Sequence, residues 1–207
     1  MSASEIIFPT FKKDKKTQVE IKNTIPSIIK FFSSVDGLEH AYKGIIMDEN
    51  HASITNDPGI GIFVLEWENI KAFHDFYPQS DQYRDFSTLV GPLLAAKPVP
   101  RLYEPIDGTL TACLNAPITQ IFVLQASASL NRWRDLVSSI KKQAHSRPSF
   151  YHAMGIEQDV GTFISMIGWS SVQEYELFGR EANIQEFKKE IGHASTSIVV
   201  RFEPLKV

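Results

Sequence analysis

The chain has 207 residues, of which 43% are hydrophobic and 22% charged, and its formal net charge is −3. This composition is that of a globular protein, and the lack of a basic excess argues against nucleic-acid binding. The single cysteine, Cys113, cannot form an internal disulfide, and we find neither a signal-peptide pattern nor an apolar run long enough to span a membrane. We therefore expect a cytoplasmic protein that binds neither membranes nor nucleic acids.

The first half of the chain predicts the order strand, helix, strand, strand, helix, strand. Apolar runs indicate the strands, and apolar residues three or four positions apart indicate the helices. The predicted strands are 5–11, 38–48, 61–67 and 99–105, and the predicted helices are 19–35 and 69–92. Thr17, with Glu20 three residues later, resembles a capping box ahead of the first helix. Pro26 predicts that this helix kinks or restarts, and 78–81 divides the second helix into two pieces. The polar segment 49–59 predicts a long excursion that could act as a lid.

The same order recurs in the second half after a Gly-, Asn- and Pro-containing linker at about 106–117. The predicted strands are 119–126, 150–157, 161–169 and 197–205, and the predicted helices are 130–145 and 171–191. This repetition predicts two modules, 1–107 and 108–207, each with a ferredoxin-like βαββαβ order and hence an α+β fold.

Two segments, 61–76 and 161–178, carry the repeat most clearly. Each is an apolar strand that ends in a tryptophan, Trp67 or Trp169, and is followed by a helix with apolar or aromatic residues at steps of three. Both alternating sets of side chains in each strand are apolar. A strand with no polar face is covered on both sides, which predicts that both strands lie inside the protein.

On these segments the chain resembles a tandem pair of modules of the dimeric α/β-barrel superfamily. This superfamily includes antibiotic-biosynthesis-type (ABM) monooxygenases, polyketide cyclases, haem-degrading monooxygenases and stress-responsive A/B-barrel proteins. The resemblance implies two antiparallel sheets packed face to face as an intramolecular dimeric α/β-barrel, a pseudo-dimer within one chain. A homodimer is then not needed to complete the barrel, although a homo-oligomer stays open.

The resemblance does not extend to haem chemistry. Haem-degrading members combine a first-strand Asn, the strand Trp and a histidine nine residues after it. Here the ninth positions are Phe76 and Phe178, the predicted first strands contain no Asn, and His74 belongs to another helix face. The sequence has no phosphate loop and no pair of metal ligands at helical or loop spacing, so we expect neither a cofactor nor a metal.

The remaining acid/base candidates are the histidines of the second strand in each half, His40 and His152. A neutral imidazole in an apolar cavity is a suitable general base near neutral pH, although a structural role is the commoner one. Tyr42 shares the face of His40 and could donate a proton or anchor a hydroxyl. If His152 points away from the pocket of its half, Tyr151 takes its place.

We expect a hydrophobic small molecule to contact aromatic residues in these pockets. The predicted ligand-binding residues are Trp67 and Phe76 in the first half and Ser165, Trp169, Tyr175 and Phe178 in the second, which we favour as the working half.

Two functions stay open. One is a cofactor-independent enzyme of the monooxygenase, cyclase or isomerase type that acts on an aromatic or polyketide-like compound of secondary metabolism. The other is a non-catalytic protein for stress response or ligand binding.

Overall fold

The computed structural model describes residues 2–49, 61–143, 147–178, 184–187 and 196–206. The main sheet consists of β1 (Ala3–Ile7), β3 (Leu38–Glu49), β4 (Ile62–Trp67), β6 (Arg101–Gly108), β7 (Ile118–Gln125), β8 (Ser149–Gly155), β9 (Thr162–Trp169) and β10 (Thr196–Lys206). Its hydrogen-bonding order, β1-β4-β3-β10-β7-β9-β8-β6, is that of a closed antiparallel barrel. The fold is therefore α+β, as predicted.

The helices are α1 (Lys15–Phe32), α2 (Ile70–Phe76), α3 (Asp81–Val90), α4 (Leu110–Leu114), α5 (Ala126–Gln143) and α6 (Val172–Phe178), with the short 3₁₀ turns η1 (Gly91–Leu93) and η2 (Glu157–Asp159). Two further short strands, β2 (Thr10–Phe11) and β5 (Leu94–Ala96), pair with each other. Among the described residues, no helix is both long and apolar enough to cross a membrane.

Two compact units make up the chain. The first contains the described residues of Met1–Ile45, Asn56–Leu102 and Glu203–Val207, and the second contains those of Ile46–Thr55 and Tyr103–Phe202. The strand order includes the runs β6-β1-β4-β3 and β10-β7-β9-β8, each of which is the order of a ferredoxin-like βαββαβ sheet. The division into fused modules at residues 107 and 108 stays a prediction.

The start of the first unit differs from the prediction of one strand over 5–11. β1 ends at Ile7, and Pro9 separates it from β2, because proline has no N–H for a sheet ladder. The following helix begins at Lys15, four residues earlier than predicted, because Asp14 rather than Thr17 is its N-cap: the Asp14 carboxylate accepts a hydrogen bond from the Thr17 N–H at 2.9 Å. The helix assignment runs through Pro26 without a restart.

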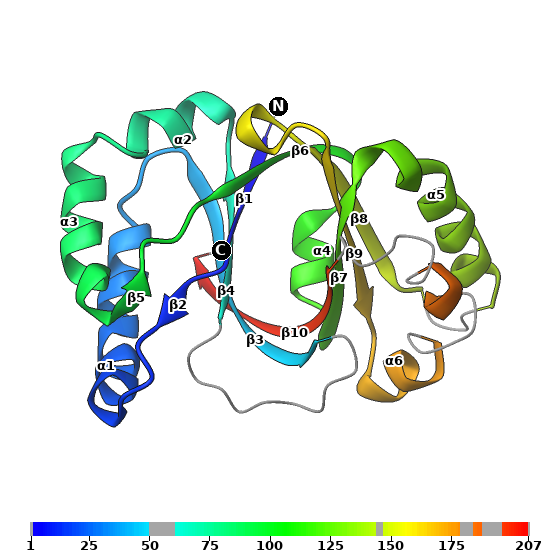
Figure 1. The fold of residues 1–207 in the computed structure, drawn as a ribbon, viewed down its shortest axis with the longest axis horizontal. Helices are drawn as coiled ribbons and strands as arrows, with labels where there is room; N and C mark the ends of the chain where they lie inside the picture. The colour runs from blue at the N-terminus through cyan, green and yellow to red at the C-terminus, as the bar shows by residue number, and fades with distance from the viewer. Residues whose placement is uncertain (1, 50–60, 144–146, 179–183, 188–195, 207) are drawn as a thin grey trace. The chain divides into compact units, whose positions relative to one another are not determined.

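The predicted division of the second helical segment is confirmed. Asn69 caps α2, and Ser80 caps α3 by accepting a hydrogen bond from the Tyr83 N–H at 2.9 Å. Helices α1, α2 and α3 lie on one side of β1 and β4 (Figure 1). The space between these helices and the strands holds the cavities of the first unit.

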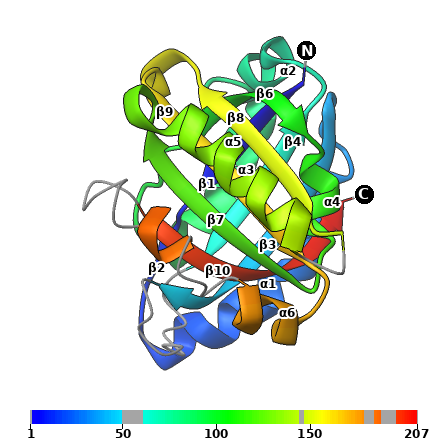
Figure 2. The same cartoon turned by 90° about the vertical axis from the view of Figure 1, so that its right-hand side faces the viewer.

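In the second unit, β7, β8 and β9 form a continuous antiparallel ladder, and α5 crosses one of its faces (Figure 2). Residues 163–169 of β9 are all buried, which confirms that this strand has no polar face exposed to water. The core on the helix side comprises Ile118, Phe122, Leu124, Trp133, Leu136, Ile140, Phe163, Ile167, Trp169, Tyr175, Ile184, Phe187 and Val199.

Several boundaries in this unit differ from those predicted. Helix α5 begins at Ala126, which the prediction assigned to the preceding strand. The predicted linker 106–117 contains the end of β6 and helix α4, of which Leu110, Cys113 and Leu114 are buried. Of the predicted helix 171–191, α6 covers 172–178, the residues 184–187 are helical, and 179–183 and 188–191 lie outside the described residues. The predicted lid 49–59 lies, beyond residue 49, outside them as well.

Candidate active site

A carboxylic acid and a tryptophan meet on the helix side of the first unit. In the antiparallel pair of β1 and β4, Ala3 lies opposite Trp67 and Glu5 opposite Leu65. Alternation therefore places Glu5 and Trp67 on one face as diagonal neighbours. The indole N–H of Trp67 donates a hydrogen bond to Oε2 of Glu5 at 2.8 Å, and only 5% of Glu5 is exposed.

Burial changes the acidity of Glu5. Because a carboxylate loses hydration in the apolar surroundings, burial raises the pKa of Glu5 from its ordinary value of 4.5 to about 7, against the opposing effect of the Trp67 hydrogen bond. The carboxyl group is thus close to half ionised at neutral pH. Such a group suits proton abstraction, for which the best pKa lies near the working pH.

Glu5 lines a cavity of about 460 Å³, the Glu5 cavity, whose other lining side chains include Phe76, Tyr77, Tyr83, Phe86 and Ser87. This volume falls within the range of about 300–1,000 Å³ typical of small-molecule sites. One buried carboxylate among mainly apolar and aromatic side chains is the composition expected for a site that orients a hydrophobic molecule and exchanges a proton with it.

Aromatic contacts hold the wall opposite the strands. The Phe76 ring packs against Trp67 at 5.6 Å and edge-on against Tyr83 at 5.7 Å, and the Tyr77 and Tyr83 rings are 4.9 Å apart. Phe76, predicted as a ligand contact, therefore lines the cavity. Trp67, also predicted as a contact, is fully buried and is not part of the lining, so its place is to support Glu5 and Phe76.

Sequence reasoning missed Glu5. The resemblance to haem-degrading proteins directs attention to an asparagine in the first strand, whereas the structure places a carboxylic acid from that strand in hydrogen-bond contact with Trp67. The signal available in the sequence was weak. A single charged residue near the start of an apolar strand is typical of a solvent-exposed strand end. Only the register of β1 and β4 shows that Glu5 is buried.

His40 and Tyr42 do not join this site. The Nδ1 atom of His40 lies 3.0 Å from Oε2 of Glu66, which precedes Trp67 in β4 and points to the opposite face. Tyr42 pairs with Val64 on that same opposite face and is buried. The two predicted candidates of the first half therefore lie across the sheet from Glu5.

His152 lies on the helix side of the second unit, and Tyr151, also buried, is on the other face of β8. The indole N–H of Trp133 donates to Nδ1 of His152 at 3.2 Å, and burial lowers the pKa of His152. A neutral ring with Nδ1 accepting carries its proton on Nε2. In this arrangement His152 offers a hydrogen-bond donor, not a free basic nitrogen.

The predicted ligand contacts of the second half belong to a packed core. Ser165 lies opposite His152 in the β8–β9 pair, the Trp169 and Tyr175 rings are 6.4 Å apart, and Phe178 packs against the same cluster. The hydroxyl of Ser165 and the indole N–H of Trp169 are buried and have no hydrogen-bond partner in the described part of the chain. His152 also lines a separate cavity of about 270 Å³ with Asp107 and Lys141.

His74, which the comparison with haem-degrading proteins raised, is exposed on α2 and contacts the Phe73 ring. It does not line the Glu5 cavity. Within the described residues, no group of three or more His, Cys, Asp or Glu side chains is arranged to hold a metal ion.

Comparison with known proteins identifies the fold. An anthrone oxidase-like protein matches with a TM-score of 0.60 and 11% identity over 99% of this chain and 93% of its own. A presumed monooxygenase from Lactobacillus acidophilus matches with a TM-score of 0.59 and 9% identity over 99% and 97%. A variant of the chlorite dismutase of Candidatus Nitrospira defluvii matches with a TM-score of 0.56 and 9% identity over 99% and 91%.

No family model and no curated protein matches the sequence. At these low identities the structural similarity establishes the fold alone, and each comparison covers nearly the whole of both chains. The chain therefore has the fold of the dimeric α/β-barrel proteins, a group whose solved members include monooxygenase-like and chlorite dismutase-like proteins.

Proposed function

We propose that the protein is a cofactor-independent enzyme that removes a proton from a hydrophobic aromatic or polyketide-like compound in the Glu5 cavity, in an oxygenation of the monooxygenase type. The observation that carries this proposal is the buried carboxyl group of Glu5, whose pKa is about 7 and which accepts a hydrogen bond from Trp67. The anthrone oxidase-like neighbour supports the choice of oxygenation over cyclisation or isomerisation.

The chemistry needs a base and molecular oxygen. The Glu5 carboxylate takes a proton from an acidic carbon between aromatic rings or beside a carbonyl, and the electron pair of the broken C–H bond enters the ring system. The resulting carbanion is electron-rich and is oxidised by O₂. For anthrone the balanced reaction is anthrone plus O₂ giving anthraquinone plus water.

Glu5 is the proposed base in place of His152 for a geometric reason. The Trp133 N–H occupies Nδ1 of His152, and the other ring nitrogen then carries the proton. The Trp67 N–H also binds Glu5, but a carboxylate has a second oxygen and further lone pairs to accept a proton. The Glu5 carboxylate can therefore still accept a proton while it is hydrogen-bonded to Trp67.

Oxygen consumption with anthrone as the probe tests the proposal. We expect turnover in the wild-type protein and a loss of at least about 10²-fold in Glu5→Gln, which keeps the side-chain shape but cannot accept the proton. The matched control is Glu66→Gln, which removes a carboxylate on the opposite face of β4 beside His40. It should leave turnover within about twofold of wild type.

The alternative is a non-catalytic protein that binds a hydrophobic ligand, and the apolar lining of the cavities is what favours it. If the protein binds anthrone but consumes no oxygen, and if Glu5→Gln binds anthrone equally well, this alternative is supported and the enzymatic proposal is rejected.

A further inference from the structure

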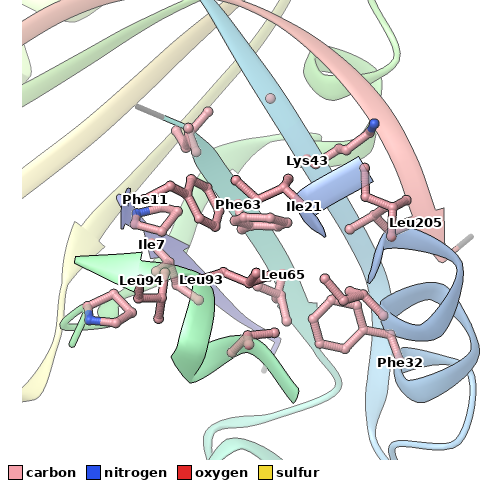
Figure 3. A pocket seen from close by; sticks show the side chains of 18 of the residues that line it. Ile7, Phe11, Ile21, Phe32, Lys43, Phe63, Leu65, Leu93, Leu94 and Leu205 are labelled. Atoms are coloured by element: carbon pink, nitrogen blue, oxygen red, sulfur yellow. The ribbon is translucent and has the colours of Figure 1, made fainter. Parts of the chain in front are cut away.

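A second cavity in the first unit adjoins the Glu5 cavity and differs from it in chemistry. It has a volume of about 230 Å³, and we call it the apolar cavity. Its lining residues include Ile25. The side chains of Ile7, Ile21, Phe63 and Leu205, which also line it, converge on the space in Figure 3. Apart from Lys43, every side chain that lines it is apolar.

Lys43 does not offer its charge to this space. Its ammonium nitrogen lies 2.6 Å from the Glu203 carboxylate, and in Figure 3 it points away from the apolar side chains. A ligand group in the apolar cavity therefore has no side-chain hydrogen-bond partner among the described residues. Only a group without polar atoms enters such a space without losing hydration that nothing replaces.

The two cavities share part of their walls. Ile7, Leu65, Phe86 and Leu94 line both of them, and Ile7 follows Glu5 by two residues on the same face of β1. A molecule whose reacting part lies beside Glu5 can therefore extend along these shared side chains into the apolar cavity. The site as a whole then has one end with a carboxyl group and one end lined by apolar side chains.

In the second unit, the corresponding space between helix and sheet is filled by side chains. There α5 places Trp133 over the sheet, and Trp133, Phe122 and Phe163 are each at most 1% exposed. In the first unit α1 presents Ile21 and Ile25 to the sheet, and both remain only half-buried. Smaller side chains on α1 thus leave apolar surface that the described part of the protein does not cover.

From these observations we propose that the substrate of the Glu5 site carries an apolar tail, which the apolar cavity binds. The proposal deepens the proposed function, on which it rests, by stating its substrate class: an amphiphile with an aromatic or carbonyl-activated head at Glu5 and a hydrocarbon tail between α1 and the strands. The tail's contribution comes from removal of its surface from water, because the cavity offers it no polar side-chain contact.

Titration calorimetry with hexanol, octanol and decanol, all primary and unbranched, tests the tail site without knowledge of the substrate. We expect the dissociation constant to fall by about fourfold for each added methylene group until the cavity is full. Ile25→Trp, which places in α1 the kind of side chain that α5 has in Trp133, should weaken decanol binding at least about tenfold. Ile25→Phe should cause a smaller loss in the same direction and serves if the tryptophan variant does not fold.

Val19→Trp is the matched control, because Val19 lies on the same helix and is 59% exposed. It should bind decanol within about twofold of wild type. Binding that does not depend on chain length, or an equal loss in Val19→Trp and Ile25→Trp, would overturn the proposal.

Glu5→Gln separates this inference from the proposed function. The variant should keep the chain-length dependence of alkanol binding, because Glu5 does not line the apolar cavity. Length-dependent binding together with unchanged turnover in Glu5→Gln would reject the catalytic role and keep the tail site. If Glu5→Gln loses turnover but alkanol binding does not depend on chain length, the catalytic role is kept and the tail site is rejected.

Discussion

The proposed chemistry depends on one buried carboxyl group, that of Glu5, and that group also links folding to pH. A glutamic acid whose pKa is raised in the folded state holds its proton more tightly there than in the unfolded chain. The contribution of this proton to the free energy of unfolding is complete below pH 4.5, and it is lost as the pH rises to about 7. The shift corresponds to about 3 kcal/mol.

We therefore expect the free energy of unfolding to fall by about 3 kcal/mol more in the wild-type protein than in Glu5→Gln between about pH 4.5 and pH 7.5. Urea unfolding at several pH values measures it. Parallel stability curves for the two proteins would show that Glu5 ionises in the folded state as it does in water.

The tryptophan beside Glu5 sets how far the pKa rises. Because the indole N–H stabilises the carboxylate, its hydrogen bond lowers the pKa of Glu5. Trp67→Phe should therefore raise that pKa further and move the rising limb of the kcat/KM profile to higher pH. The substitution also leaves a space in the core and should destabilise the protein by about 1–3 kcal/mol. If the rising limb of the kcat/KM profile stays at the same pH, the hydrogen bond from Trp67 does not affect the pKa of Glu5.

His152 should behave as a structural residue. His152→Ala removes the acceptor for the buried Trp133 N–H, and an unpaired buried donor costs about 1–3 kcal/mol. We expect that loss in urea unfolding, with turnover per folded molecule close to wild type. A loss of turnover of about 10²-fold or more in a folded variant would return the acid/base role to His152.

At the scale of elements, the cap of α3 positions one wall of the Glu5 cavity. The Ser80 hydroxyl accepts a hydrogen bond from the Tyr83 N–H, and Tyr83 lines the cavity. Ser80→Ala should lower the free energy of unfolding by about 1 kcal/mol. Ser27→Ala, at an exposed position within α1, should leave it within about 0.5 kcal/mol and serves as the control. Equal effects would show that the cap does not hold α3.

The periodic apolar patterns predict the eight strands of the main sheet in their order along the chain, but not the separate short strands β2 and β5. β4 and β9 were placed within one residue, because continuous apolar runs that end in tryptophan have few other interpretations. The boundaries failed where a short polar signal competed with the pattern. Asp14, not Thr17, caps α1, and the short helix α4 occupies a stretch whose composition indicates a loop.

The candidate site was less predictable than the fold. Phe76 follows from the helix face that the repeat defines, and it lines the cavity. Glu5 does not follow, since its burial and its hydrogen bond with Trp67 depend on the register of two strands that are far apart in the sequence. The faces of His40 and His152 likewise depended on strand register, which composition does not determine.

At the scale of the whole molecule, the resemblance predicts that one chain supplies both halves of its barrel. If so, stability should not depend on association. We expect the same melting temperature at protein concentrations of about 1 μM and 100 μM, measured by circular dichroism, because a folded monomer is not linked to a dimer by mass action. A melting temperature that rises with concentration would show that a partner chain is needed.

The pKa of Glu5 in the folded protein is the measurement on which the proposed role of this residue depends most. Carbon-detected NMR of protein labelled at the glutamate side-chain carboxyl carbon follows each group as the pH changes, and comparison with Glu5→Gln assigns the Glu5 signal. We expect this carboxyl group to titrate with a pKa of about 7. A pKa near the ordinary value of 4.5 would show that Glu5 is a solvated carboxylate and not a base held in an apolar cavity, and it would reject the proposed role of Glu5.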